Sequence, residues 1–121
     1  MKELTEHQIQ ASIVDWCHHM SFKYPCLDWI HAIPNGGKRH IVTATKLKRE
    51  GVKAGIPDLF LPEPMAPNWH GLYIEVKKKG GKVSKPQKSC MDYLQSIGYM
   101  TCVVYSLDDA IREIEKYLEN D

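Results

Sequence analysis

The spacing of the apolar residues changes repeatedly along this chain, and this alternation restricts the fold more than any other feature of the sequence. Ile9, Ile13 and Trp16 recur at the spacing of one helical face, whereas residues 29–33 form a short run typical of a strand. Glycine and proline separate such segments, as in the Pro-Asn-Gly-Gly sequence of residues 34–37. The predicted order is helix, strand, helix, strand, strand, helix, strand, helix. This order favours an α/β fold in which α-helices flank a mixed β-sheet.

Capping and turn residues set the bounds of these elements. Helices are expected over residues 6–20 and 40–50, from Ser84 to Gly98, and from Ser106 onward. Strands are expected over residues 29–33, 58–61, 72–77 and 99–105, and we expect 58–61 to pair antiparallel with 72–77. In the last helix the residues expected to be buried are Ala110, Ile111, Ile114 and Leu118.

The size and composition indicate one domain. The chain has 121 residues, 43% of them hydrophobic and 26% charged, and we expect a single domain over residues 1–121 without an appended DNA-binding domain. No apolar run reaches the ~18 residues of a membrane span, and the first residues do not resemble a signal peptide. We therefore expect a cytoplasmic protein with no membrane partner. The irregularly spaced cysteines are expected to be reduced core residues: Cys17, Cys26, Cys90 and Cys102.

Charges are segregated along the chain although they nearly cancel in the total of +1. Residues 38–53 contain six basic residues and one acid, residues 77–88 contain six lysines and no acid, and residues 108–121 are mainly acidic. Two basic segments predict a face that binds a polyanion, although exposed lysines often serve only solubility. The residues proposed to contact nucleic acid are Lys38, Arg39, Lys78, Lys79, Lys82 and Lys85.

Three charged residues lie on the two strands expected to be adjacent. Glu75 and Lys77 are two positions apart, so their side chains leave the same face of the sheet. Asp58 begins the preceding strand, and pairing of the two strands would bring it close to Glu75. Two carboxylates with waters and a phosphate oxygen are a usual environment for Mg²⁺, and a neighbouring lysine suits phosphodiester hydrolysis. The alternative is that Glu75 and Lys77 form an ordinary surface ion pair.

Glu6 and Gln87 allow two interpretations each. Glu6 lies beside the apolar stripe of the first helix, where an acid either complements the helix dipole or serves a site. Gln87 completes a capping box with Ser84, yet it also begins a helix that follows Lys77 and is able to orient a water there.

Taken together, the motifs of this chain resemble those of the VRR-NUC nucleases, which belong to the PD-(D/E)XK superfamily. The resemblance extends over essentially the whole chain and implies a restriction-endonuclease-like core. The motifs that carry it are Glu6 with Gln10, residues 34–37, residues 51–59, Glu75-Val76-Lys77 and residues 84–87. The connection formed by residues 62–71 departs from the family pattern, since it is longer and richer in proline, and it is expected to reshape either the substrate groove or an oligomer contact.

The resemblance also implies roles for the residues of the site. Asp58, Glu75 and the Val76 carbonyl would bind Mg²⁺ or Mn²⁺, and Lys77 would position the water and stabilise the transition state. Glu6 and Gln87 would be accessory catalytic residues. The chain is similar to the stand-alone phage and bacterial members, which look like homodimeric Holliday-junction resolvases.

Two functions from different classes follow. The first is a Mg²⁺-dependent, structure-specific DNA endonuclease that cleaves branched DNA, a four-way junction or a flap, as a homodimer. The alternative is a non-catalytic nucleic-acid-binding module with the same basic face. A third interpretation, a structural domain whose lysines are only solvated, predicts no salt-dependent affinity for DNA.

Overall fold

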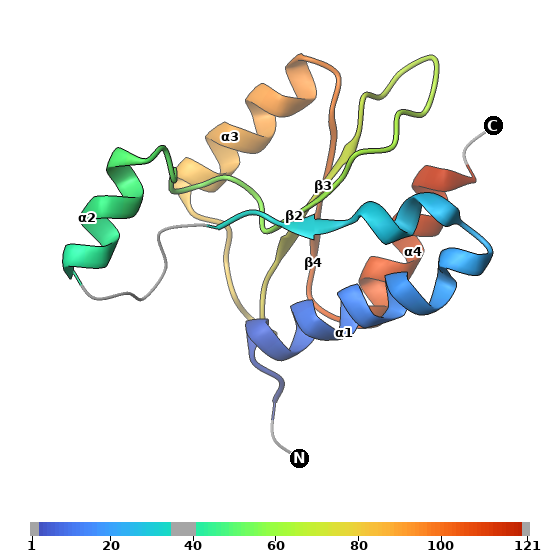
Figure 1. Ribbon diagram of the computed structural model, residues 1–121, viewed down its shortest axis with the longest axis horizontal. Coiled ribbons are helices and arrows are strands. Elements are labelled where there is room, and N and C mark those ends of the chain that lie inside the picture. Colours follow the sequence, from blue (N-terminus) through green and yellow to red (C-terminus); the bar gives the residue numbers. More distant parts are fainter. Residues whose placement is uncertain (1–2, 35–40, 120–121) are drawn as a thin grey trace.

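A computed structural model describes residues 3–34 and 41–119, and its centre is a four-stranded sheet (Figure 1). The strands are β1 (His31–Ala32), β2 (Leu59–Leu61), β3 (Leu72–Val76) and β4 (Met100–Val104), in that spatial order. β1, β2 and β3 pair antiparallel, and β3 and β4 pair parallel. The predicted mixed sheet and the antiparallel pairing of β2 with β3 are therefore confirmed.

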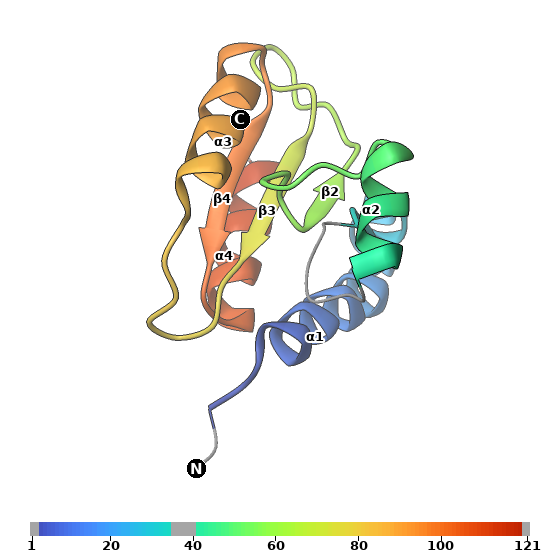
Figure 2. The same cartoon turned by 90° about the vertical axis from the view of Figure 1, so that its left-hand side faces the viewer.

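Helices cover both faces of this sheet. They are α1 (Glu6–His19), α2 (Ile41–Arg49), α3 (Lys85–Ser96) and α4 (Leu107–Leu118). Buried residues of α1 and α4, such as Ile13 and Ile114, form one core with the inward residues of β2 and β3, such as Leu59 and Ile74. α3 lies on the opposite face, while α4 lies behind the strands (Figure 2). None of these helices is long and apolar enough to cross a membrane.

The predicted N-terminal caps of α1, α3 and α4 are confirmed. Thr5 and Gln8 form a capping box at α1, and Ser84 and Gln87 form a second one at α3. The side chain of Ser106 accepts a hydrogen bond from the backbone of Asp109 at the start of α4. Side chains thus satisfy backbone N–H groups that have no partner within their helices.

Some predictions of burial and local structure are wrong. Tyr117, and not Ile111 or Leu118, is the buried residue of α4 beside Ala110 and Ile114. Met20, predicted to end the first helix, begins the 3-10 helix η1 (Met20–Phe22), and Trp29, predicted to begin a strand, ends the 3-10 helix η2 (Pro25–Trp29). All the cysteines are free as predicted, but only Cys17 is fully buried.

The long connection between β2 and β3 is held in place by specific contacts. Met65 and Trp69 pair through their backbones, and both pack against the core. The hydroxyl of Tyr117 donates a hydrogen bond of 2.6 Å to the Glu63 carbonyl. Tyr117 is therefore buried because its ring fills the core while its hydroxyl has a partner in the connection.

The segment between α2 and β2 approaches the start of α3 very closely at Gly55. Gly55 has a φ of +93°, and a Cβ atom built there would lie 3.0 Å from the carbonyl carbon and oxygen of Pro86. Gly51 has a φ of +103° but open space around the same position. The two glycines share a backbone requirement, and only Gly55 also requires the absence of a side chain.

We expect Gly55→Ala to lower the free energy of unfolding by about 1–3 kcal/mol, and by more than Gly51→Ala does. Both variants strain a positive φ, while the first also pushes against the Pro86 backbone. Urea unfolding of the two variants and the wild type measures the difference. Equal decreases would show that the contact with Pro86 contributes nothing.

Candidate active site

The pairing of β2 with β3 brings Asp58 and Glu75 together. Leu59 lies opposite Ile74, so the next position of this antiparallel register places Asp58 opposite Glu75. The Asp58 Oδ2 atom accepts a hydrogen bond of 2.7 Å from the Val76 backbone N–H. This bond fixes one carboxylate beside the other at the end of β3.

Lys77 lies next to Glu75 in a largely buried position. The Lys77 Nζ and Glu75 Oε2 atoms are 3.7 Å apart, and the two residues are 9% and 3% exposed. The alternative of an ordinary surface ion pair is therefore wrong. Burying charged groups is unfavourable unless their partners compensate for lost hydration, so two buried charged residues with the half-buried Asp58 opposite them need a reason.

The electrostatic environment of Glu75 is unusual. Burial, followed by the charge of Asp58 and a hydrogen bond between the two carboxyls, raises the pKa of Glu75 from 4.5 to about 8. Lys77 opposes this rise in pKa, and Glu6 adds to it. Without another cation, this environment favours the protonated form of the Glu75 carboxyl.

Gln87 completes the predicted capping box and also contacts Glu75. Its Oε1 atom accepts a 2.8 Å hydrogen bond from the Ser84 backbone N–H in the capping box. Its Nε2 atom donates a 3.1 Å hydrogen bond to Glu75 Oε2. The start of α3 therefore orients the Glu75 carboxyl directly.

Glu6 lies at the edge of this site and is exposed. Its Oε2 atom accepts a hydrogen bond of 3.3 Å from the Lys78 backbone N–H. Glu6 and Asp58 also line a groove of about 640 Å³ between α1 and the end of β1. None of residues 62–71 lines this groove, so the long connection does not shape it.

The predicted nucleic-acid contacts fall into two groups. Four are exposed in the segment between β3 and α3 or at the start of α3: Lys78, Lys79, Lys82 and Lys85. Lys38 and Arg39 lie outside the described residues. Within residues 3–34 and 41–119, no three His, Cys, Asp or Glu side chains are grouped closely enough to hold a metal ion by themselves. A metal here would depend on two carboxylates, with Glu6 farther away.

Sequence reasoning missed three features of the site. The Val76 N–H bond to Asp58 and the close approach of Gly55 to Pro86 depend on the tertiary structure. Burial and then the charge of Glu75 raise the pKa of the Cys90 thiol, so α3 also places this cysteine near the site. The capping-box pattern of Ser84 and Gln87 was the one feature of the sequence that predicted where α3 begins, and this start contacts Glu75.

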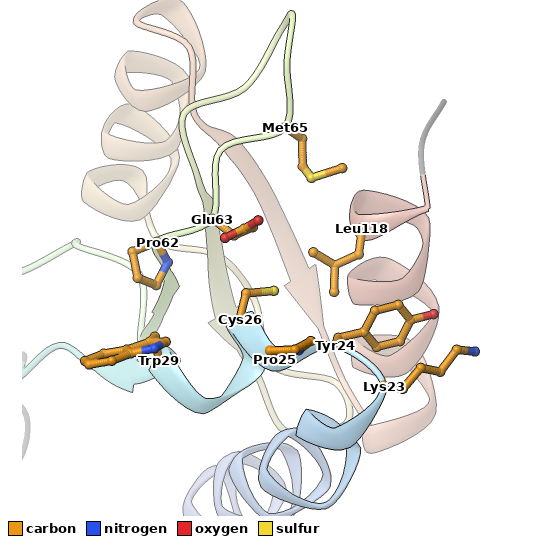
Figure 3. A pocket seen from close by; sticks show the side chains of 9 residues that line it. All are labelled: Lys23, Tyr24, Pro25, Cys26, Trp29, Pro62, Glu63, Met65 and Leu118. Carbon is orange, nitrogen blue, oxygen red and sulfur yellow. The ribbon is translucent and has the colours of Figure 1, made fainter.

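A second pocket of about 600 Å³ lies away from these residues (Figure 3). It is formed by η2, the start of the long connection and the end of α4, with Cys26, Glu63 and Leu118 among its lining residues. The connection therefore shapes this pocket and not the groove beside Asp58.

Comparison with known proteins identifies the family. The family model described as the VRR-NUC domain matches residues 4–108. The chain belongs to the VRR-NUC family. A solved structure described as a VRR_NUC domain protein shares 36% sequence identity with this VRR-NUC domain and has a TM-score of 0.81. The similarity covers 98% of this chain and 91% of that one. No curated protein matches the chain. VRR-NUC domains are in general nucleases, and the predicted restriction-endonuclease-like fold is confirmed.

The raised pKa of Glu75 makes stability depend on pH. The unfolded chain ionises this carboxyl near pH 4.5 and the folded protein near pH 8, so the stability present below pH 4.5 is lost as the pH rises toward 8. We expect the melting temperature of metal-free protein to fall over this range, and to fall several degrees less in Glu75→Gln.

Thermal unfolding at pH 5 and pH 8 measures this difference. Comparing the two pH values within each protein cancels any pH-independent cost of the substitution. The same decrease in both proteins would mean that Glu75 ionises normally.

Proposed function

We propose that this VRR-NUC domain is a DNA endonuclease that depends on Mg²⁺ or Mn²⁺ and cleaves branched DNA. The observation that carries the proposal is the position of Asp58 opposite Glu75, with the buried ammonium of Lys77 beside them. Membership of a family that consists in general of nucleases supports hydrolysis of phosphodiester bonds.

The residues present fit a divalent cation. Two carboxyls lie together, and the pKa of Glu75 remains raised although the Lys77 ammonium lowers it. A further cation would therefore stabilise the ionised form of Glu75. Hard oxygen ligands of this kind suit Mg²⁺, and Asp58, Glu75 and the Val76 carbonyl would hold it. When bound, the cation would make a coordinated water more acidic and polarise a phosphate oxygen.

The remaining steps belong to side chains of this chain. The Lys77 ammonium, held near Glu75, is able to hold the attacking water and to stabilise charge that develops on the phosphate. Gln87 and the Val76 N–H keep Glu75 and Asp58 in position, so these carboxyls need little rearrangement. Glu6 is an accessory acid at the mouth of the site.

The substrate follows from the charges next to the site. The exposed lysines between β3 and α3 suit a phosphate backbone that enters beside Lys77. We further propose a homodimer that acts on four-way junctions, because paired cuts across a symmetric junction need two sites related by a two-fold axis. One copy of this domain supplies one such site.

Cleavage of a labelled four-way junction in Mg²⁺, beside a linear duplex of matched sequence, tests the proposal. We expect Asp58→Ala and Lys77→Ala to lower the rate by about 100-fold or more, as the removal of transition-state stabilisation does. Lys116→Ala, which removes an exposed lysine of α4, is the matched control and should cleave normally. Circular dichroism establishes that each variant is folded.

The outcomes separate the parts of the proposal. Paired cuts on the junction alone support a dimeric resolvase, and cuts on every substrate remove only the preference for junctions. Tight DNA binding without cleavage in Mg²⁺ or Mn²⁺ would overturn the nuclease and favour a non-catalytic binding module.

A further inference from the structure

Helix α2 stands apart from the rest of the molecule. It lies at one edge of the molecule in Figure 1 and to the side of the sheet opposite α3 in Figure 2. In the part of the chain that the structure describes, no other helix or strand packs extensively against α2. An isolated helix this short is marginal in water, and most helices of this length are stabilised by packing against other elements. Such packing is sparse at α2 and does not by itself account for the helix.

The exposed surface of α2 is strongly basic. Lys46, Lys48 and Arg49 are exposed on the helix, and Lys53 is exposed just after it, with Glu50 as the only acid in the same stretch. None of the four basic residues forms an ion pair with any residue between 3–34 or 41–119. Lys46 and Arg49 are three positions apart on the helix, and like charges at this spacing repel each other.

A structural role accounts for only part of this charge. Cations in the last turn of a helix interact favourably with its dipole, and Lys46, Lys48 and Arg49 lie in that turn. This effect falls off within one turn, so it does not explain Lys53. The excess of positive charge is therefore available to an external polyanion.

The position of α2 relates this charge to the candidate active site. The chain runs from α2 through Gly55, which touches Pro86 of α3, directly to Asp58. In Figure 2 the lysine segment after β3 lies at the lower left and α2 lies at the right, with the end of β3 between them. Basic residues thus flank Asp58 and Glu75 from two separate elements.

We propose that the basic surface of α2 and Lys53 is a second binding surface for the DNA backbone. Together with the lysines after β3, it holds DNA on both sides of the scissile phosphate, as cleavage within a strand requires. This inference rests on the proposed function, which it deepens by naming how the substrate is held. The occupant is a phosphodiester backbone because closely spaced unpaired cations match regularly spaced phosphates.

Fluorescence anisotropy of a labelled duplex in EDTA, measured over a series of salt concentrations, tests this surface without any cleavage. The test variant is K46Q/K48Q/R49Q, in which glutamine keeps a high helix propensity. The matched control K23Q/R112Q/K116Q removes the same number of exposed charges from α4 and from the residue that follows η1. Both variants change the net charge equally.

We expect the slope of log affinity against log salt to decrease by about one for each phosphate that the protein no longer neutralises, and therefore by about three in the α2 variant. Affinity at moderate salt should fall by about tenfold or more, whereas the control should bind like the wild type. Equal decreases in the two variants would overturn the proposal, since only net charge would matter.

Two other results distinguish the possible occupants and functions. An unchanged slope with a changed mass in light scattering would make α2 a contact between copies of the chain and overturn the proposal. A wild type that cleaves no DNA, but whose salt slope depends on α2, would remove the proposed nuclease and leave the DNA-binding surface supported.

Discussion

The antiparallel pairing of β2 with β3 is the constraint on which the candidate site depends. The register that buries Leu59 and Ile74 in the core also sets Asp58 opposite Glu75 on the other face. A shift of one residue would move every side chain of the strand to the opposite face. Hydrophobic burial on one side of the sheet therefore fixes the placement of the carboxyls on the other.

Local structure around this pair serves the fold and the site together. Gln87 caps α3 and orients Glu75, and the Val76 N–H holds Asp58. Gly55 lets the segment before Asp58 lie against the first turn of α3. Burial of the Glu75 carboxyl and the Lys77 ammonium is unfavourable for folding, and such local conflicts are typical of functional sites.

The sequence predicted the order of helices and strands because helical spacing, capping boxes and glycine stops are local signals. It also predicted which charged residues lie together, since β2 and β3 are close in sequence and Glu75 and Lys77 share a strand face. It did not predict the burial of Tyr117, which depends on a hydrogen bond to the distant Glu63 carbonyl. The burial of Lys77 and the isolation of α2 were equally beyond local patterns, because both depend on tertiary packing.

We propose that Asp58 and Glu75 form one divalent-cation site. Calorimetric titration of Mn²⁺ at pH 7, repeated in buffers with different ionisation enthalpies, measures both binding and the protons released. Because burial and the charge of Asp58 raise the pKa of Glu75, we predict that binding of the cation at pH 7 releases protons. Asp58→Asn should abolish this binding. Equal binding by the wild type and Asp58→Asn would contradict the proposed site, whereas binding without proton release would contradict only the raised pKa of Glu75.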